Sequence, residues 1–186
     1  MVDNPDESRT ELDSHANMPV VGKHAYTVAE TGRTVDVSPF TPDYKAITVP
    51  LVDAEIQYDS PNSGETYISI IRNALHVPKM KNNLLPPFML REAGITVNEI
   101  PKIQVDQPSE EHHSITFPET KLRIPLSLWG VFSYFPTSKP THEMLVEPPD
   151  VYVLTPVTWD PHNDAYARNE ESMLDWEGNM RSQHDR

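Results

Sequence analysis

The sequence has no cysteine among its 186 residues, so it can form neither disulfide bonds nor thiolate metal sites. It also lacks long apolar runs. The run PLSLWGVFSYF, residues 125–135, is well short of the roughly 20 residues that a membrane-spanning helix needs. The opening MVDNPDESRTELD has no apolar stretch that could act as a signal peptide. These absences predict a protein of the cytoplasm that makes no contact with a membrane.

Positive charge is scarce, with 15 lysine and arginine residues against 28 aspartate and glutamate residues. The formal net charge of -13 would repel a phosphate backbone, and no cluster of basic residues interrupts it. We therefore expect no nucleic-acid partner.

Glycine is scarce too, with 6 glycines against 19 prolines. Because proline removes a backbone donor and breaks helix interiors, this composition favours short strands and extended segments over long helices. An apolar fraction of 37% allows one core of ordinary size. The predicted fold class is all-β with one short helix.

Changes in composition along the chain predict four segments. Residues 1–10 are polar and acidic and are expected to form a disordered linker. Residues 11–100 are expected to form the folded domain. Residues 101–163 have short apolar runs separated by prolines, which predicts a C-terminal extension of strands and loops. In the tail, residues 164–186, the apolar Met173, Leu174 and Trp176 allow a short amphipathic helix.

The folded domain has clear strand patterns. RTVDV alternates from Arg33, and KAITVPLVDAEIQY alternates up to the turn sequence DSPNSGE, which together predict two hairpins. YISIIRNALHV, residues 67–77, is rich in isoleucine and valine and predicts a buried strand. Pro86 and Pro87 are expected to open a helix whose C-terminal cap is Gly94.

The stretch TELDSHANMPVVG places Asp13, Ser14 and His15 in a row. An aspartate that acts as general acid or base in peptide hydrolysis needs a second carboxylate close by, so that the two share one proton. Asp13 has no such partner in its own loop. An Asp-Ser pair alone is also typical of a turn or a helix N-cap, and this structural interpretation stays open.

Two blocks of sequence carry a family resemblance. ELDSHAN is similar to an apolar-Asp-Ser/Thr-Gly-Ala-Asp loop, and NALHVPKMKNNLLPPFMLREAG to a strand, Val-Pro, Asn-Leu-Leu and a helix ending in glycine. Together they resemble the retropepsin-like aspartic proteases of Ty1/copia-type retrotransposon polyproteins, in particular those of diatoms and related algae. The resemblance implies that Asp13 is catalytic, that the Ser14 hydroxyl ties two active-site loops together, and that Leu84 and Leu85 pack beneath the loop.

The same resemblance implies an antiparallel barrel with a flap. RTVDVSPFTPDYKAITVP lies where such a protease has its flap hairpin, with the turn at about residues 38–45. Five substrate-binding residues follow from it: Ala16, Asn17, Ser38, Pro39 and Phe40. Because only one aspartate motif is present, the resemblance implies a homodimer with Asp13 on the twofold axis. The expected substrate is the parent polyprotein, and no cofactor is expected.

Two departures from the family pattern support an alternative function. His15 stands where the family has glycine, so a side chain must fit into the tightest part of the loop. Asn17 replaces an aspartate that often contacts the substrate backbone. The chain is then a catalytically inactive retroelement remnant or a polyprotein spacer.

A metal-dependent hydrolase is a further alternative. In an extended chain Asp13 and His15 would face the same side, as a pair of metal ligands requires. The third ligand would come from His24, from the pair His112 and His113, or from His162, although none of them shows a recognised ligand spacing.

Overall fold

A computed structural model of the chain describes residues 7–38, 43, 45–168 and 170–181. In this part of the chain most elements are strands. The others are two short α-helices and four short 3-10 helices. In chain order they are β1 (Glu7–Leu12), β2 (Val20–Val21), β3 (Tyr26–Val37), β4 (Ile47–Asp59), β5 (Thr66–His76), β6 (Asn83–Leu85), α1 (Pro87–Glu92), β7 (Thr96–Glu99), η1 (Lys102–Gln104), η2 (Glu110–His112), β8 (His113–Thr116), β9 (Arg123–Pro125), β10 (Ser127–Trp129), β11 (Phe132–Ser138), α2 (His142–Val146), β12 (Val151–Val153), η3 (Asp164–Tyr166) and η4 (Glu171–Met173). The all-β fold class is confirmed.

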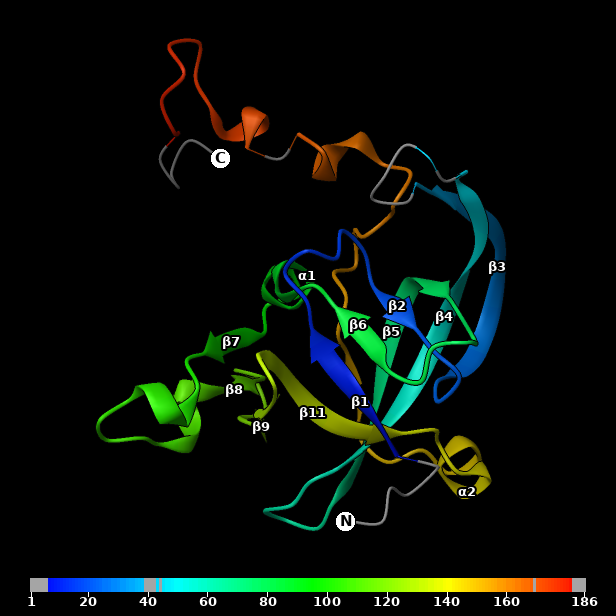
Figure 1. Ribbon diagram of the computed structural model, residues 1–186, viewed down its shortest axis with the longest axis vertical. Helices are drawn as coiled ribbons and strands as arrows, with labels where there is room; N and C mark the ends of the chain where they lie inside the picture. The colour runs from blue at the N-terminus through cyan, green and yellow to red at the C-terminus, as the bar shows by residue number, and fades with distance from the viewer. Residues whose placement is uncertain (1–6, 39–42, 44, 169, 182–186) are drawn as a thin grey trace.

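The main sheet closes on itself. Its strands follow the order β10-β11-β1-β6-β2-β5-β4-β3, and β12 pairs with β5 in parallel. Strand β11 pairs with β1 and also reaches β4, where Ser138 lies opposite Gln57. The path β11-β1-β6-β2-β5-β4 is therefore a ring of paired strands around the core. Strands β7, β8 and β9 form a separate small sheet at one side (Figure 1).

The predicted hairpins are present. Strands β3 and β4 pair antiparallel out to Val37 and Ile47, and β4 and β5 pair antiparallel up to Asp59 and Thr66. The alternation noted in the sequence places Val52, Ala54 and Ile56 almost completely out of solvent on β4. The β3 side of the first hairpin is largely exposed, because it lies at the end of the strand order.

Helix α1 follows the prediction as well. Pro86 precedes it in an extended conformation and Pro87 is its first residue, where the missing amide hydrogen costs nothing. Gly94 adopts a φ of 85°, and the Ile95 amide then donates to the Leu90 carbonyl at 3.0 Å. Glycine is suited to this position because other residues are strained at positive φ.

Three segment predictions need correction. Residues 7–10 were expected in a disordered linker, but they belong to β1, which is paired on both edges. Residues 101–163 were expected to be a separate extension, yet Phe135 and Leu154 lie in the same core as Ile71. In the tail, the part described has two 3-10 turns, η3 and η4, rather than an amphipathic α-helix. No described helix has the length and apolarity to span a bilayer.

Candidate active site

The candidate site is the loop between β1 and β2, which crosses the end of β6. Strand β6 is parallel to β1, with Leu12 opposite Leu85, and antiparallel to β2, with Val20 opposite Leu84. Strands β1 and β2 therefore flank β6 in a ψ-shaped arrangement (Figure 1). Asp13 is the first residue after β1, at the end of a strand that has partners on both sides.

Buried polar side chains hold this arrangement together. The side-chain oxygen of Asn83 accepts from the Gly22 amide at 2.9 Å, and its Nδ2 donates to Thr10 Oγ1 at 3.2 Å. Asn83 and Thr10 are both fully buried, so each bond satisfies a group that water cannot reach. The neighbouring Asn82 accepts from the Arg9 amide at 2.9 Å. The two asparagines before Leu84 thus link β6 to β1 and β2.

Gly22 allows the chain to pass close to the segment before β6. A Cβ at this position would lie 2.4 Å from the Met80 carbonyl oxygen, closer than real Cβ atoms come to any backbone atom. The Lys23 amide donates to that same carbonyl at 2.9 Å. Position 22 therefore requires glycine, because any side chain there would collide with the Met80 carbonyl.

Asp13 is fixed by three hydrogen bonds of its own loop and of β6. Its amide donates to the Leu85 carbonyl at 3.0 Å, and its carbonyl accepts from the Ala16 amide at 3.2 Å. Its carboxylate oxygen Oδ1 accepts from the His15 amide at 2.9 Å. This is the local turn that aspartate favours. Asp13 is only partly exposed, whereas Ser14 and His15 are exposed beside it.

The prediction that Asp13 lies at the Leu-Leu pair is confirmed, with one difference between the two leucines. Leu85 is fully buried beneath the loop, while Leu84 is only partly buried.

His15 does not need the conformational freedom of glycine. Among described non-glycine residues the positive φ values belong to Asn73 and Lys121, so the His15 backbone is unstrained. Its side chain is exposed at the loop surface.

The predicted substrate-binding residues divide into two groups. Ala16 and Asn17 lie in the loop after Asp13, and Asn17 is exposed. Ser38 is the exposed residue that follows β3 at the end of the first hairpin. Pro39 and Phe40 lie outside the described residues. The structure therefore places the base of the predicted flap but not its turn.

Three of the four histidines that could have joined Asp13 and His15 have polar partners elsewhere, and the fourth, His24, is buried. His112 Nδ1 lies 2.9 Å from Ser109 Oγ, and His113 Nε2 lies 2.7 Å from Ser133 Oγ. His162 Nε2 lies 3.1 Å from the Thr34 carbonyl oxygen. Within the part of the chain that the structure describes, no group of three or more histidine, aspartate or glutamate side chains is placed to hold a metal ion.

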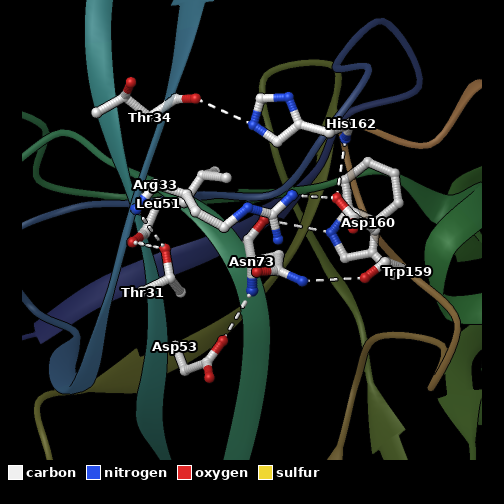
Figure 2. A network of polar contacts seen from close by, with 9 residues as sticks. All are labelled: Thr31, Arg33, Thr34, Leu51, Asp53, Asn73, Trp159, Asp160 and His162. Atoms are coloured by element: carbon white, nitrogen blue, oxygen red, sulfur yellow. Dashed lines mark hydrogen bonds and ion pairs between the residues drawn. The ribbon is translucent and has the colours of Figure 1, made fainter.

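A polar network that the sequence did not reveal lies beside the first hairpin (Figure 2). Asn73 Nδ2 donates to the Trp159 carbonyl at 3.0 Å, and the Trp159 indole donates back to the Asn73 carbonyl at 3.2 Å. The Arg33 guanidinium forms an ion pair with Asp160. The hydrogen bond from Arg33 is the larger cause, and the bond from the His162 amide the second, of a lowered pKa at the Asp160 carboxyl. Asn73 and Trp159 are 86 residues apart and Arg33 and Asp160 are 127 apart, so no local pattern could have indicated these two pairs.

A cavity of about 780 Å³ lies between the aspartate loop, α1 and the C-terminal segment. Ala16 and Asn17 form its wall nearest to Asp13, and Asp13 itself does not line it. Phe88 and Met89 of α1 and Trp159 of the C-terminal segment supply apolar surface. The cavity is therefore next to the aspartate loop, and the first loop residue that lines it is Ala16, three positions after Asp13 in the sequence.

The fold and the loop define the class of protein that the structure supports: an all-β chain whose partly exposed aspartate turn closes a ψ-shaped set of three strands. No protein-family model, curated protein or solved structure matches the chain.

Proposed function

We propose that the chain is a retropepsin-like aspartic endopeptidase segment of a Ty1/copia-type retrotransposon polyprotein, acting in the cytoplasm as a homodimer. Asp13 of each copy would supply one carboxylate of the catalytic pair. Ser14 would tie the two aspartate loops together, and the β3–β4 hairpin would close over an extended peptide as the flap. The substrate would be the parent polyprotein.

One observation carries this proposal: Asp13 is held at the end of the β1–β6 pair by its bond to the Leu85 carbonyl, with Ser14 and His15 exposed next to it. A partly exposed carboxylate at the end of a strand is the group that would have to meet its copy across a twofold axis. The order of elements supports the same function, because aspartate loop, flap hairpin, second hairpin, Asn-Leu-Leu strand and helix follow one another as the family resemblance implies.

The mechanism follows from two carboxylates that share one proton. Like charges a few ångströms apart cannot both ionise, so the pair holds one proton near neutral pH. The charged Asp13 would activate a water molecule, and the protonated one would donate to the carbonyl oxygen of the scissile bond. Hydrolysis should therefore be favoured below neutral pH.

The test is cleavage of a mixture of peptides by the purified chain between about pH 4 and 7, with new peptide ends identified by mass spectrometry. Asp13→Asn should abolish cleavage while the circular-dichroism spectrum stays unchanged. Asp106→Asn is the matched control, because Asp106 is another loop aspartate, is exposed, and lies far along the chain from the candidate site. A chelator should leave the rate unchanged, whereas the metal-hydrolase alternative requires its loss.

Dimer formation adds a second criterion. Because each active site needs two chains, the rate per chain should fall on dilution below the dissociation constant. The proposal fails if no Asp13-dependent cleavage occurs at any pH in that range and His15→Gly does not restore it. The remnant or spacer alternative would then stand.

A further inference from the structure

The segment that follows β12 is attached to the body of the protein by few buried residues. We refer to residues 155–166 as the strap. It contains no strand and ends in the turn η3. Thr155 and Pro156 are buried, as is Leu154 just after β12, and beyond them Trp159 is the one strap residue that is buried. Val157 is 90% exposed, whereas Trp159 is 6% exposed. Beyond Pro156 the strap is thus held mainly through the buried Trp159, with the partly buried Tyr166 packed edge-on against it at 5.1 Å between ring centroids.

The surface that receives Trp159 is assembled from distant parts of the chain. Trp159 forms an apolar cluster with side chains of the β1–β2 loop, β4, β5 and α1: Met18, Val49, Leu51, Leu75 and Met89. A deep aromatic anchor surrounded by exposed contacts is typical of a bound peptide, where a few residues supply most of the binding energy.

Polar groups around the anchor select for tryptophan followed by an acidic residue. Asn73 accepts the indole N–H and donates to the carbonyl of the same residue, at 3.2 and 3.0 Å (Figure 2). The Arg33 guanidinium binds the carboxylate of the next residue, Asp160. A phenylalanine would leave the Asn73 carbonyl without its indole donor, and an asparagine would remove the charge that Arg33 binds.

The position of the strap connects it to the aspartate loop and to the first hairpin. His162 Nε2 lies 3.1 Å from the Thr34 carbonyl oxygen on β3, the strand that leads into the predicted flap. On the other side, Trp159 lines the cavity of about 780 Å³ together with Ala16 and Asn17. In Figure 1 the segment after β12 rises past α1 and the upper end of the β3–β4 hairpin. It crosses between the two elements that would enclose a peptide substrate.

We propose that the surface beneath the strap is a peptide-binding site for a Trp-Asp sequence, and that the strap is a displaceable internal peptide that occupies it. Peptide binding at this site is independent of the proposed function, but the role of the site in receiving substrate rests on it. The strap would then slow cleavage by the intact chain without abolishing it, and substrates would carry a tryptophan followed by an acidic residue beside the cavity.

An internal peptide competes strongly with an external one. A segment tethered by a short link acts at an effective concentration near the millimolar range. The intact chain should therefore bind little added peptide, and the site should become available only when the strap is weakened.

The experiment titrates a fluorescent peptide of residues 155–166 into three full-length chains and follows its anisotropy. The wild type has a filled site, Asp160→Asn weakens the strap, and Trp159→Ala removes its anchor. All three keep Asn73 and Arg33 on the body. The peptide should bind Trp159→Ala at least about tenfold more tightly than the wild type. Asp160→Asn should lie between them, and the peptide carrying Trp159→Ala should not bind to any of the three.

Asp160 is about half exposed, so Asp160→Asn leaves the fold intact and provides an answer even if Trp159→Ala unfolds. Equal, negligible binding to the wild type and to a folded Asp160→Asn would overturn the proposal. Binding does not require catalysis: peptide capture without any cleavage would retain this site and remove the proposed endopeptidase function. Conversely, Asp13-dependent cleavage at the same rate in all three chains, without peptide binding, would retain the enzyme and remove the inhibitory strap.

Discussion

Asn73 and Trp159, 86 residues apart in the chain, each donate a hydrogen bond to the backbone carbonyl of the other. Asn73 can do this because it lies in a bulge of β5, where the register with β4 shifts between Val52 and Ala54. Its φ of 49° is left-handed, a conformation that asparagine tolerates better than most residues. The Asp53 carboxylate accepts the Asn73 amide at 3.0 Å and holds the bulge in place.

Replacing Asn73 should destabilise the protein in two separable ways. Asn73→Gly keeps the left-handed backbone but removes the side-chain amide, so it should lower the free energy of unfolding by about 1 kcal/mol. Asn73→Ala loses the amide and also strains the backbone, which should cost about 1 kcal/mol more. Urea denaturation measures both. Equal effects would mean that the left-handed conformation is not retained.

Trp159 itself gives a local readout of the same variants. Of the three tryptophans, Trp129 and Trp176 are 59% and 91% exposed, so Trp159 dominates the blue-shifted part of the emission. A red shift in Asn73→Gly before global unfolding would indicate release of the strap. An unchanged emission maximum would show that the apolar cluster alone holds Trp159.

Gly22 and Gly94 should both resist alanine, for different reasons. At Gly22 a Cβ meets the Met80 carbonyl oxygen at 2.4 Å, so the backbone must move and Gly22→Ala should cost about 1–3 kcal/mol. At Gly94 nothing lies within 4 Å, and the cost of roughly 1 kcal/mol comes from its φ of 85°. Thermal unfolding of the two variants checks this. A smaller loss at Gly22 than at Gly94 would contradict the close approach.

The parts of the fold that were predictable from sequence are those with local causes. Alternating residues specified β4 and the part of β3 from Arg33, and the isoleucine- and valine-rich run specified β5. The two prolines and Gly94 specified α1, and the resemblance placed Asp13 beside Leu85. The return of residues 101–163 into the core was not predictable, because Phe135 and Leu154 have partners far away in the chain. Likewise, β1 begins at Glu7 despite its polar sequence, since Ser8 and Thr10 are buried against Thr137. Buried polar strands resemble linkers in composition.

The shared core predicts one cooperative unfolding transition. Phe135 is fully buried on β11 and packs edge-on against Tyr58 of β4, at 6.0 Å between ring centroids. Phe135→Ala should lower the free energy of unfolding by about 3–5 kcal/mol, and Leu85→Ala on β6 by about 2–5 kcal/mol. In each variant, circular dichroism and tryptophan fluorescence should report the same midpoint. Two separate midpoints would favour a division near residue 100.

His113 should make the protein less stable in mild acid. Its ring is buried on β8 with Nε2 2.7 Å from Ser133 Oγ. Burial, and then the charge of Lys102, lowers the pKa of His113 from its ordinary value of 6.5. Below pH 6.5 the unfolded chain therefore binds a proton that the folded chain does not, so stability falls as the pH falls from 6.5 toward the folded pKa. Above pH 6.5 this contribution is fully present.

His113→Gln retains an amide near Ser133 but cannot ionise, so its free energy of unfolding should change less between pH 7.5 and 5.5. Lys102→Gln removes only the smaller cause and should reduce the dependence in part. If the wild type and His113→Gln lose equal stability over this range, the acid sensitivity arises elsewhere in the chain.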